Sequence, residues 1–273
     1  MVEWNSLENC RVARPPGFES LPLRQSSFNR FSLKMNLILF DSSEVSPFAI
    51  PLSDPRYHHI KNILKARLGD ELTIGQINGR MGKGRIAAIH EENVTVEAVN
   101  LDQEPPKPLA ITLILALPRP PMLQRTLAAV ASLGIKRIYL IQTNRVEKSY
   151  WNSHVLKPEE IRKTLILGLQ QAKDTVLPEV HLKKRFKPFV QDELPGIAEG
   201  FLKLAAHPEA GAKSCPVDVK QPVILMIGPE GGFVPYEIEL LKQAGFQTVH
   251  LGERILRFET AVEGLLCRIA NIS

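Results

Sequence analysis

From Ile111 onward the chain alternates apolar strands with amphipathic helices, and this pattern constrains the fold more than any other feature. The segments "ITLILALP", "KRIYLIQT" and "PVILMIG" are apolar almost throughout, as strands buried on both faces are. Between and after them lie "MLQRTLAAVASLG", "PEEIRKTLILGLQQAKD" and "PYEIELLKQAG", which have helical spacing, and a final helix is expected from Glu259. Weaker strands are expected at "FLKLAAH" and "QTVHLG". The alternation predicts an α/β domain with a parallel sheet and helices on both faces.

A different pattern comes before this domain. Between Met35 and Leu101, the segments "NLILF", "DELTIGQ", "GRIAAIH" and "NVTVEAV" are typical of short strands, with turn-forming "SPFAIPLSDP" and "INGRMGKG" between them. They predict a small β-barrel, interrupted by a short basic helix within residues 54–67. The proline-rich "DQEPPKP" is typical of a linker. We therefore predict one domain over residues 35–104 and a second over residues 105–273.

Residues 1–34 show neither helical nor strand periodicity and lack the apolar core of a secretory signal. We expect them to be a non-native or disordered extension. One hypothesis is a misplaced start codon, because "GFES" back-translates to the T-arm sequence of a tRNA gene, and the native chain would then begin at Met35. The alternative is an organellar transit peptide, against which the acidic Glu3, Glu8 and Glu19 count.

Composition excludes several classes of protein. A chain of 273 residues with 44% hydrophobic and 23% charged residues is long enough for two globular domains. No apolar run approaches the roughly 18 residues of a membrane span. Cys10, Cys215 and Cys267 share no short spacing, and His58 and His59 have no evident third ligand, so no metal site is indicated and a reducing cytoplasm is expected. The net charge of +5 weakly favours a polyanionic partner.

The glycine-rich stretch "LMIGPEGGF", residues 225–233, follows a predicted strand, where a phosphate site would be expected. A Walker loop needs lysine followed by serine or threonine after its last glycine, whereas Phe233 follows Gly232. The glycine spacing also differs from that of a dinucleotide fingerprint, and Glu230 would repel a phosphate. The stretch is therefore either a plain strand-to-helix turn or part of a pocket for another kind of ligand.

A second motif, "LGERILRFETA" at residues 251–261, follows the next predicted strand and separates these alternatives. Its Glu259 and Thr260 stand where a helix start favours a carboxylate and a hydroxyl. Together the two motifs resemble the S-adenosylmethionine-binding loops of SPOUT-class RNA methyltransferases, in particular the ribosomal RNA small subunit methyltransferase E family. The resemblance extends from about Met35 to the C-terminus and includes "HHIKNILKARLGD" and "LALPRPPMLQRTLAAVASLGI".

The resemblance implies a PUA-like RNA-binding domain followed by a SPOUT methyltransferase domain with a deep trefoil knot. It further implies a cytoplasmic homodimer that methylates N3 of a uridine in 16S rRNA of the small ribosomal subunit, with S-adenosyl-L-methionine as cofactor. Alternatives are methylation of another RNA nucleotide and a non-catalytic RNA-binding role in ribosome assembly. By carry-over, the cofactor is expected to contact Ile227, Gly228, Pro229, Glu230, Gly231, Gly232, Leu251, Gly252, Ile255, Leu256, Thr260 and Ala261.

Methylation at uracil N3 requires an unpaired base and loss of the N3 proton, so negative charge develops on O2 and O4. Arg257, and after it Arg254, are the candidates to stabilise that charge, because arginine stays cationic at neutral pH and cannot act as the base. Glu259 or solvent is the candidate proton acceptor, and a helix cap is the alternative role for Glu259.

In the first domain seven cations fall in two short stretches free of Asp and Glu, which predicts a phosphate-binding face. They are Arg56, Lys61, Lys65, Arg67, Arg80, Lys83 and Arg85. The chain also departs from the family pattern at Lys65, Ala129, Ser132 and Asp174, positions expected on the substrate side. Arg119, Arg125 and Arg145 are candidates to compensate for these departures.

Overall fold

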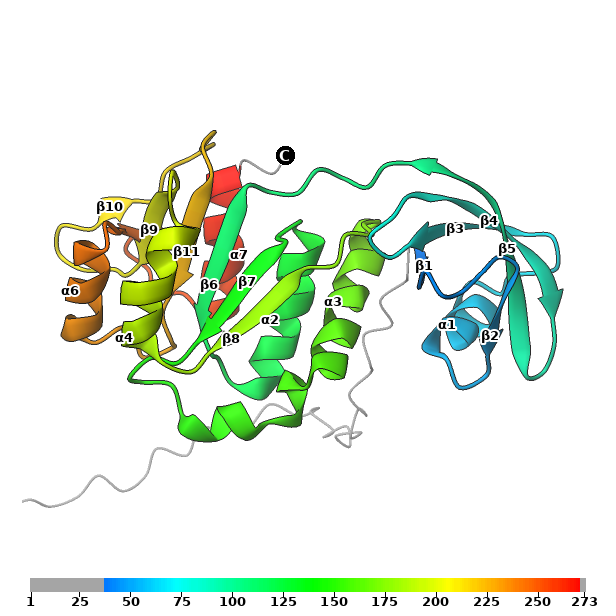
Figure 1. Cartoon of the computed structure of the whole chain (residues 1–273), viewed down its shortest axis with the longest axis horizontal. Helices are drawn as coiled ribbons and strands as arrows, with labels where there is room; N and C mark the ends of the chain where they lie inside the picture. Colours follow the sequence, from blue (N-terminus) through cyan, green and yellow to red (C-terminus); the bar gives the residue numbers. More distant parts are fainter. Residues whose placement is uncertain (1–36, 271–273) are drawn as a thin grey trace, which may run out of the picture. The chain divides into compact units, whose positions relative to one another are not determined.

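The computed structural model of the protein describes residues 37–270. The predictions for residues 1–34 lie outside this range. Within it the chain forms two sheets, one of five strands and one of seven (Figure 1). Each sheet is described by itself below.

The first sheet has the order β1-β3-β4-β5-β2, and it is antiparallel except for the parallel pair β1 and β3. Buried apolar side chains from every strand form its core, with Ile50, Ile74 and Val96 fully buried. The bounds are β1 (Ile38–Phe40), β2 (Phe48–Pro51), β3 (Glu71–Gln76), β4 (Met81–Ile89) and β5 (Asn93–Gln103).

Three details of this part differ from the expectation. Strand β2 lies inside "SPFAIPLSDP", which was expected to be a turn, and it pairs with β5 along the edge of the sheet. Strand β4 begins at Met81, so the expected turn "INGRMGKG" is half strand, and β5 continues to Gln103, into the expected linker. The basic helix is present as α1 (Pro55–His58) followed by the π-helical η1 (His59–Ile63), and the Asp54 carboxylate caps it by accepting the Arg56 N–H at 2.8 Å.

The second sheet is parallel throughout and has the order β10-β12-β9-β11-β6-β7-β8. Its expected strands are β6 (Ile111–Ala116), β7 (Arg137–Ile141), β9 (Leu202–Ala206), β11 (Val223–Ile227) and β12 (Gln247–His250). Two edge strands, β8 (Glu179–Lys183) and β10 (Lys213–Ser214), were not expected. The predicted α/β class with a parallel sheet is confirmed.

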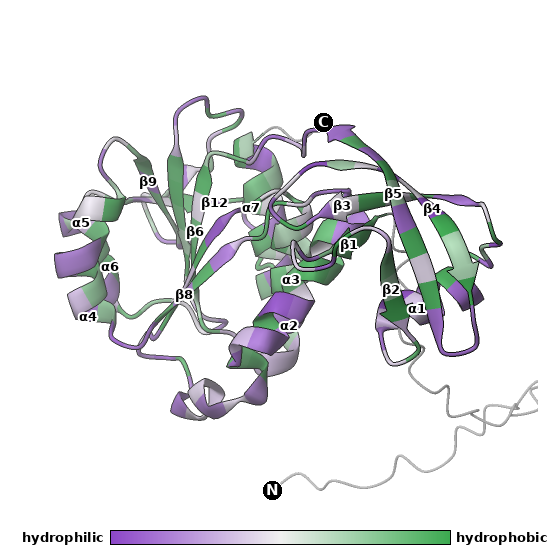
Figure 2. Cartoon of the chain, turned by 45° about the vertical axis from the view of Figure 1, so that its right-hand side comes forward, coloured by the Kyte–Doolittle hydropathy of each residue, from purple (hydrophilic) through white to green (hydrophobic). Residues whose placement is uncertain are grey.

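Helices cover both faces of this sheet because alternate side chains of each strand point to opposite faces. In β11, Leu225 joins the core beneath α2 (Pro120–Ser132), α3 (Pro158–Ala172) and α7 (Phe258–Ala270), whereas Met226 joins the core beneath α6 (Pro235–Gln243). Figure 1 shows α4 (Phe186–Pro188) and α6 on one side of the sheet and α2, α3 and α7 on the other. Figure 2 shows hydrophobic residues along the strands between them. Short helical segments η2 (Lys148–Asn152), η3 (His154–Leu156), η4 (Phe189–Glu193) and α5 (Leu194–Ile197) complete the connections.

The strand order brings three carboxyl ends together. Ile227 at the end of β11 pairs with Ala206 at the end of β9, and Ala206 pairs in turn with Val249 of β12. Ligands of open parallel sheets bind beyond the carboxyl ends of the strands. The glycine-rich motif and the second motif, residues 251–261, therefore meet at the edge of the sheet where a ligand site is expected.

Candidate functional site

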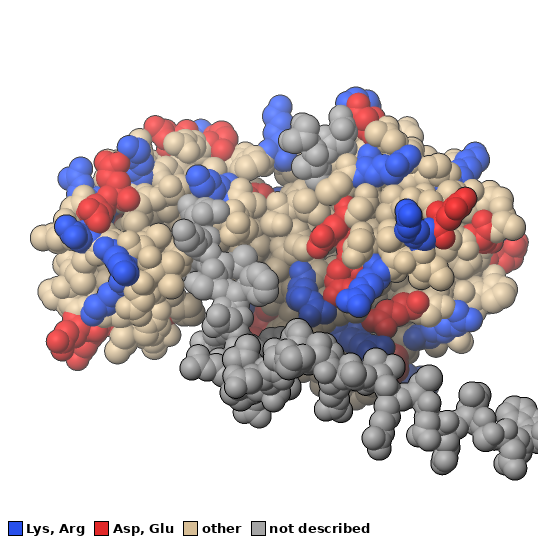
Figure 3. All heavy atoms as spheres, turned by 180° about the vertical axis from the view of Figure 1, so that it is seen from behind, with Lys and Arg blue, Asp and Glu red and all other residues tan. Residues whose placement is uncertain are grey.

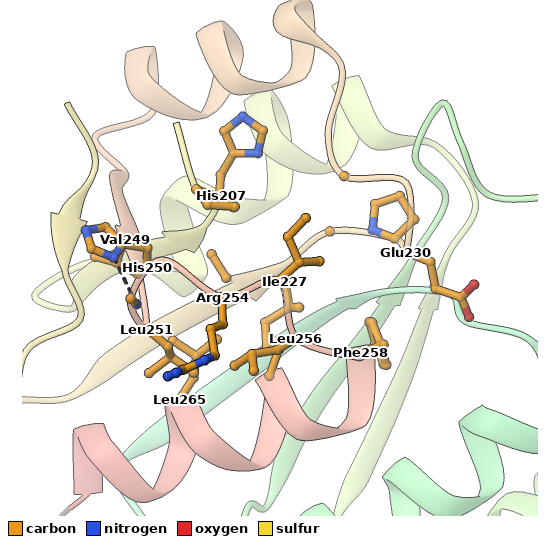
Figure 4. Close-up of a pocket in the computed structure, with 18 of the residues that line it drawn as sticks. His207, Ile227, Glu230, Val249, His250, Leu251, Arg254, Leu256, Phe258 and Leu265 are labelled. Carbon is orange, nitrogen blue, oxygen red and sulfur yellow. Dashed lines mark hydrogen bonds between the residues drawn. The ribbon is translucent and has the colours of Figure 1, made fainter. Parts of the chain in front are cut away.

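A cavity of about 380 Å³ opens at these three carboxyl ends (Figure 4). This volume falls within the range of small-molecule sites, about 300 to 1,000 Å³. Its walls come from the segments that follow β9, β11 and β12 and from the first turns of α7. The cavity is lined by Ala206, His207, Pro208, residues 227–232, residues 249–256, Phe258, Ala261 and Leu265.

The first glycine-rich motif presents backbone to the cavity. The Gly232 N–H donates to the Pro229 carbonyl at 2.7 Å, and Gly232 has a φ of +75°, which a residue with a side chain rarely adopts. A Cβ at Gly228 would lie 2.9 Å from the Phe233 ring, so no side chain fits there. The motif is therefore a tight turn whose main chain forms one wall.

Glu230 does not use its carboxylate inside the cavity. Figure 4 shows this carboxylate directed away from His207 and Ile227, and its Oε2 lies 3.0 Å from the Arg119 guanidinium. The backbone of Glu230 lines the cavity, while its side chain ties the loop to the start of α2.

The second motif forms the opposite wall with little internal bonding. Gly252 has a φ of +127°, and its N–H donates to Nδ1 of His250 at 3.0 Å. Among residues 37–270, the N–H groups of Glu253, Arg254, Ile255 and Leu256 have no hydrogen-bond acceptor. This loop therefore offers free backbone donors beside the cavity.

The structure shows which of the residues implied by the family resemblance line the cavity. Every expected cofactor residue lines the cavity except Thr260, which lies in the first turn of α7 with its side chain exposed while Phe258 and Ala261 face the cavity. Of the candidate catalytic residues, Arg254 lines the cavity, whereas Arg257 and Glu259 do not.

Glu259 is bonded in a way that favours the capping role over the proton-accepting one. A hydrogen bond from its own backbone N–H, with a further contribution from Arg125, holds the pKa of its carboxyl below the usual value. The Arg125 guanidinium lies 2.7 Å from Oε1 of this carboxylate. A carboxylate held in its ionised form is a weak base.

Sequence reasoning missed the wall that follows β9. "HPEAGAK" was expected to be a surface loop, yet His207 and Pro208 line the cavity, and the His207 ring packs edge-on against Phe233 at 6.3 Å between centroids. Burial lowers the pKa of His207, and Lys242 and Arg145 act in the same direction. The pairing of β9 with β11 is the signal that would have placed His207 here, and it is not visible in the local sequence.

Three arginines hold the two motifs against the rest of the domain. Arg119 pairs with Glu230, Arg125 pairs with Glu259, and the Arg145 guanidinium donates to the Gly231 carbonyl. The carboxylate of buried Glu237 adds a further link, since it accepts the N–H groups of Asn144 and Val234. The three candidates for compensation thus contact the loops of the cavity, and the compensation itself stays a prediction.

Three of the four departures from the family pattern lie in the protein interior or in helix contacts, whereas Lys65 is exposed. Asp174 is only 3% exposed, and its Oδ2 lies 2.6 Å from the Lys136 ammonium, so the expectation of a substrate-facing position is wrong for Asp174. The Ser132 hydroxyl donates to the Ala129 carbonyl at 2.7 Å, which links two further departures within α2.

The predicted phosphate-binding face of the first domain is partly neutralised. Arg56 pairs with Glu44 and Asp54, Arg80 with Glu104, and Lys83 with Glu71. Burial opposes the charge of Arg56, but the hydrogen bonds that its guanidinium donates to both carboxylates outweigh this effect and raise its pKa. Arg56 is therefore part of a structural ion-pair cluster and is not available to a phosphate. Figure 3 shows basic and acidic side chains interspersed over the face in view.

Two further site classes find no support within residues 37–270. No group of three side chains there is arranged to hold a metal ion. No helix in the same range is long and apolar enough to cross a membrane.

Comparison with known proteins agrees with this geometry. Residues 105–269 match the model of the RNA methyltransferase domain, and residues 52–99 match that of the RNA methyltransferase PUA domain. The ribosomal RNA small subunit methyltransferase E of Treponema pallidum is 33% identical over 235 residues, which cover 83% of this chain and 87% of that protein. The protein of the same name, numbered 1, from Borreliella burgdorferi is 28% identical over 229 residues, 83% of this chain and 94% of that protein.

Solved structures share the fold. The ribosomal RNA small subunit methyltransferase E of Neisseria gonorrhoeae bound to S-adenosyl methionine superposes with a TM-score of 0.66 at 23% identity, over 85% of this chain and 96% of that one. A probable rRNA-methyltransferase from Porphyromonas gingivalis gives a TM-score of 0.67 at 23% identity, over 85% of this chain and 95% of that one. The chain belongs to the ribosomal RNA small subunit methyltransferase E family of RNA methyltransferases.

Proposed function

We propose that the protein transfers the methyl group of S-adenosylmethionine to N3 of a uridine in 16S rRNA of the small ribosomal subunit. Family membership supports the cofactor, the enzyme class and the rRNA substrate. The observation in the structure that carries the proposal is the cavity at the carboxyl ends of β9, β11 and β12. Two of its walls, residues 227–232 and residues 251–256, present backbone to a ligand.

The residues of the cavity fit S-adenosylmethionine. The cofactor carries no phosphate, and no lysine lines the cavity. The free N–H groups of residues 253–256 suit the polar edge of adenine, because they have no acceptor among residues 37–270. Apolar Ile227, Leu251 and Leu265 suit the flat faces of the base. When bound, the cofactor supplies an electrophilic methyl group.

The protein must also stabilise the uracil as it loses its N3 proton. Arg254 lies on the cavity wall and Arg257 follows in the same exposed loop, which supports a role for both as hydrogen-bond donors to O2 or O4 of a base that approaches the opening. We assign this role to the two arginines. The Glu259 carboxylate already accepts hydrogen bonds from its own backbone N–H at the start of α7 and from Arg125. Solvent is therefore the better candidate for the proton acceptor.

A homodimer would complete the site. Ile255 is 99% exposed although it is apolar and stands on the rim of the cavity, and Leu256 beside it is also exposed. Contact with a second copy or with the bound ligands would cover this apolar surface. The trefoil knot, the domain boundary near residue 104 and the cytoplasmic location belong to the same proposal and rest on the family.

Two measurements test the proposed function. Calorimetry with S-adenosylmethionine should show binding at one site per chain, and its absence would favour a non-catalytic assembly factor. Mass spectrometry of 16S rRNA from a deletion strain should show loss of one N3-methyluridine, and an unchanged level would reject the proposed target.

The Arg257→Ala variant tests the catalytic assignment. We expect turnover at saturating RNA to fall by about 100-fold, in the range measured for removal of one donor to a developing oxyanion, with RNA affinity changed much less. Weak RNA binding with normal turnover at saturation would assign Arg257 to RNA recognition instead.

A further inference from the structure

Two segments at the carboxyl edge of the second sheet concentrate positive charge outside the cavity. Residues 142–152 follow β7 and residues 183–188 end and follow β8, and together they hold six basic side chains and one acidic side chain. Lys183 pairs with Glu193. The other five basic residues form what we call the cationic strip, namely Arg145, Lys148, Lys184, Arg185 and Lys187.

The fold places these segments side by side. Strands β7 and β8 are parallel neighbours, and the Gln142 N–H donates to the Lys183 carbonyl at 2.9 Å just beyond their ends. The Lys184 ammonium lies 5.8 Å from the centre of the Trp151 ring, within the range of a cation–π contact. The two segments that hold the strip therefore lie against each other beyond the ends of β7 and β8.

The charge of the strip is not cancelled locally. All five side chains are exposed, and none forms an ion pair with a carboxylate of residues 37–270. In the first domain, by comparison, three of the seven predicted cations have acidic partners, namely Arg56, Arg80 and Lys83. Exposed and unpaired cations in a row are what a nucleic acid backbone requires.

The strip also adjoins the cavity. Arg145 donates to the Gly231 carbonyl in the first glycine-rich motif, so one end of the strip touches the cavity wall. RNA phosphates held along the strip would bring the nucleotides beside them to the opening where Arg254 lies.

We propose that the cationic strip binds the phosphate backbone of the rRNA substrate next to the target base. This inference rests on the proposed function, since it assumes that the polyanionic partner is the rRNA to be methylated. It adds an RNA contact at the edge of the methyltransferase sheet to the one that the sequence predicts in the first domain.

The test is a triple variant, Lys184→Gln, Arg185→Gln and Lys187→Gln, which leaves Arg145 and its contact with the cavity intact. Filter binding with unmethylated 16S rRNA and with assembled small subunits should show a dissociation constant raised about tenfold for at least one of the two. The slope of log affinity against log salt should fall by about 2, at about 0.7 per lost phosphate contact. Affinity for S-adenosylmethionine should stay within about twofold.

The matched control removes the same charge elsewhere, with Lys163→Gln, Lys213→Gln and Lys220→Gln, all exposed and outside the strip. We expect its RNA affinity to stay within about twofold of the wild type. Equal RNA affinities of the two triple variants would overturn the inference, even with an active wild type. A wild type that binds RNA through the strip but does not methylate it would support the strip and reject the proposed function.

Discussion

Asp174 is a position where this chain departs from the family pattern, and it gives a sharp test of how the protein interior accommodates the change. Its carboxylate is buried against the Lys136 ammonium, with side chains 4% and 14% exposed. Both groups also bond to Val176, because the Asp174 carboxylate accepts the Val176 N–H at 2.9 Å and Lys136 donates to the Val176 carbonyl at 2.7 Å. The perturbation is Asp174→Ala, which leaves the ammonium without its counter-charge.

The structure sets the expected size of the effect. Breaking a buried ion pair costs about 3 to 5 kcal/mol. The lower end applies here, because Lys136 keeps the Val176 carbonyl and some contact with water. We expect about 3 kcal/mol for Asp174→Ala and a similar loss for Lys136→Met. In the double variant neither charge is left unpaired, so the total should be about 3 kcal/mol, well below the sum of the two single losses.

Urea denaturation of the four proteins, followed by tryptophan fluorescence and by circular dichroism, measures these free energies of unfolding. Cofactor affinity measured by calorimetry under native conditions should not change, because neither residue lines the cavity. Single losses below about 1 kcal/mol, or a double variant that shows the full sum, would refute the view that Asp174 and Lys136 form a coupled buried pair.

Two further predictions concern the cavity. Gly228→Ala places a Cβ 2.9 Å from the Phe233 ring, so calorimetry should show S-adenosylmethionine affinity at least about fivefold weaker, given about 1 to 3 kcal/mol for such overpacking. Gly196→Ala, where a Cβ has open space, is the control, and equal affinities would contradict the close approach at Gly228. Because burial lowers the pKa of His207, its ring is neutral at pH 7 and gains a positive charge only as the pH falls through that lowered pKa. Affinity for the cationic cofactor should therefore fall as the pH is taken below the ordinary histidine pKa of about 6.5 in the wild type and much less in His207→Asn, and parallel pH profiles would count against this role.

The sequence predicted the parts of the fold whose local pattern matches their environment. The central strands β6 and β11 are buried on both faces and contain almost only apolar residues, so their type was evident. The edge strand β8 has only five residues, none of them fully buried, and its short alternation of polar and apolar residues was overlooked. Gly84 suggested a turn, but it lies within β4. Glycine fits this position because a Cβ there would come within 2.8 Å of the Ile74 side chain.

The site was predicted where its residues are contiguous and missed where distant segments meet. The motifs at residues 225–233 and 251–261 could be found because each joins a predicted strand before it to a predicted helix after it. His207 and the arginine contacts could not, because pairs such as Arg119 with Glu230 join residues more than 100 positions apart. The local sequence also did not show that Glu71 of β3 and Glu104, which follows β5, pair with two of the first-domain cations, and the phosphate-binding face there stays a prediction.

The arginine contacts to the two cavity loops bear on how this pocket could be transplanted. Arg119, Arg125 and Arg145 all precede the motifs in the chain, and they come from α2 and from the segment after β7. Grafting residues 225–261 onto another parallel sheet would transfer the glycines but none of these anchors. The smallest portable cofactor module therefore begins no later than β6, and a protein engineer who wants the pocket must take most of the sheet with it.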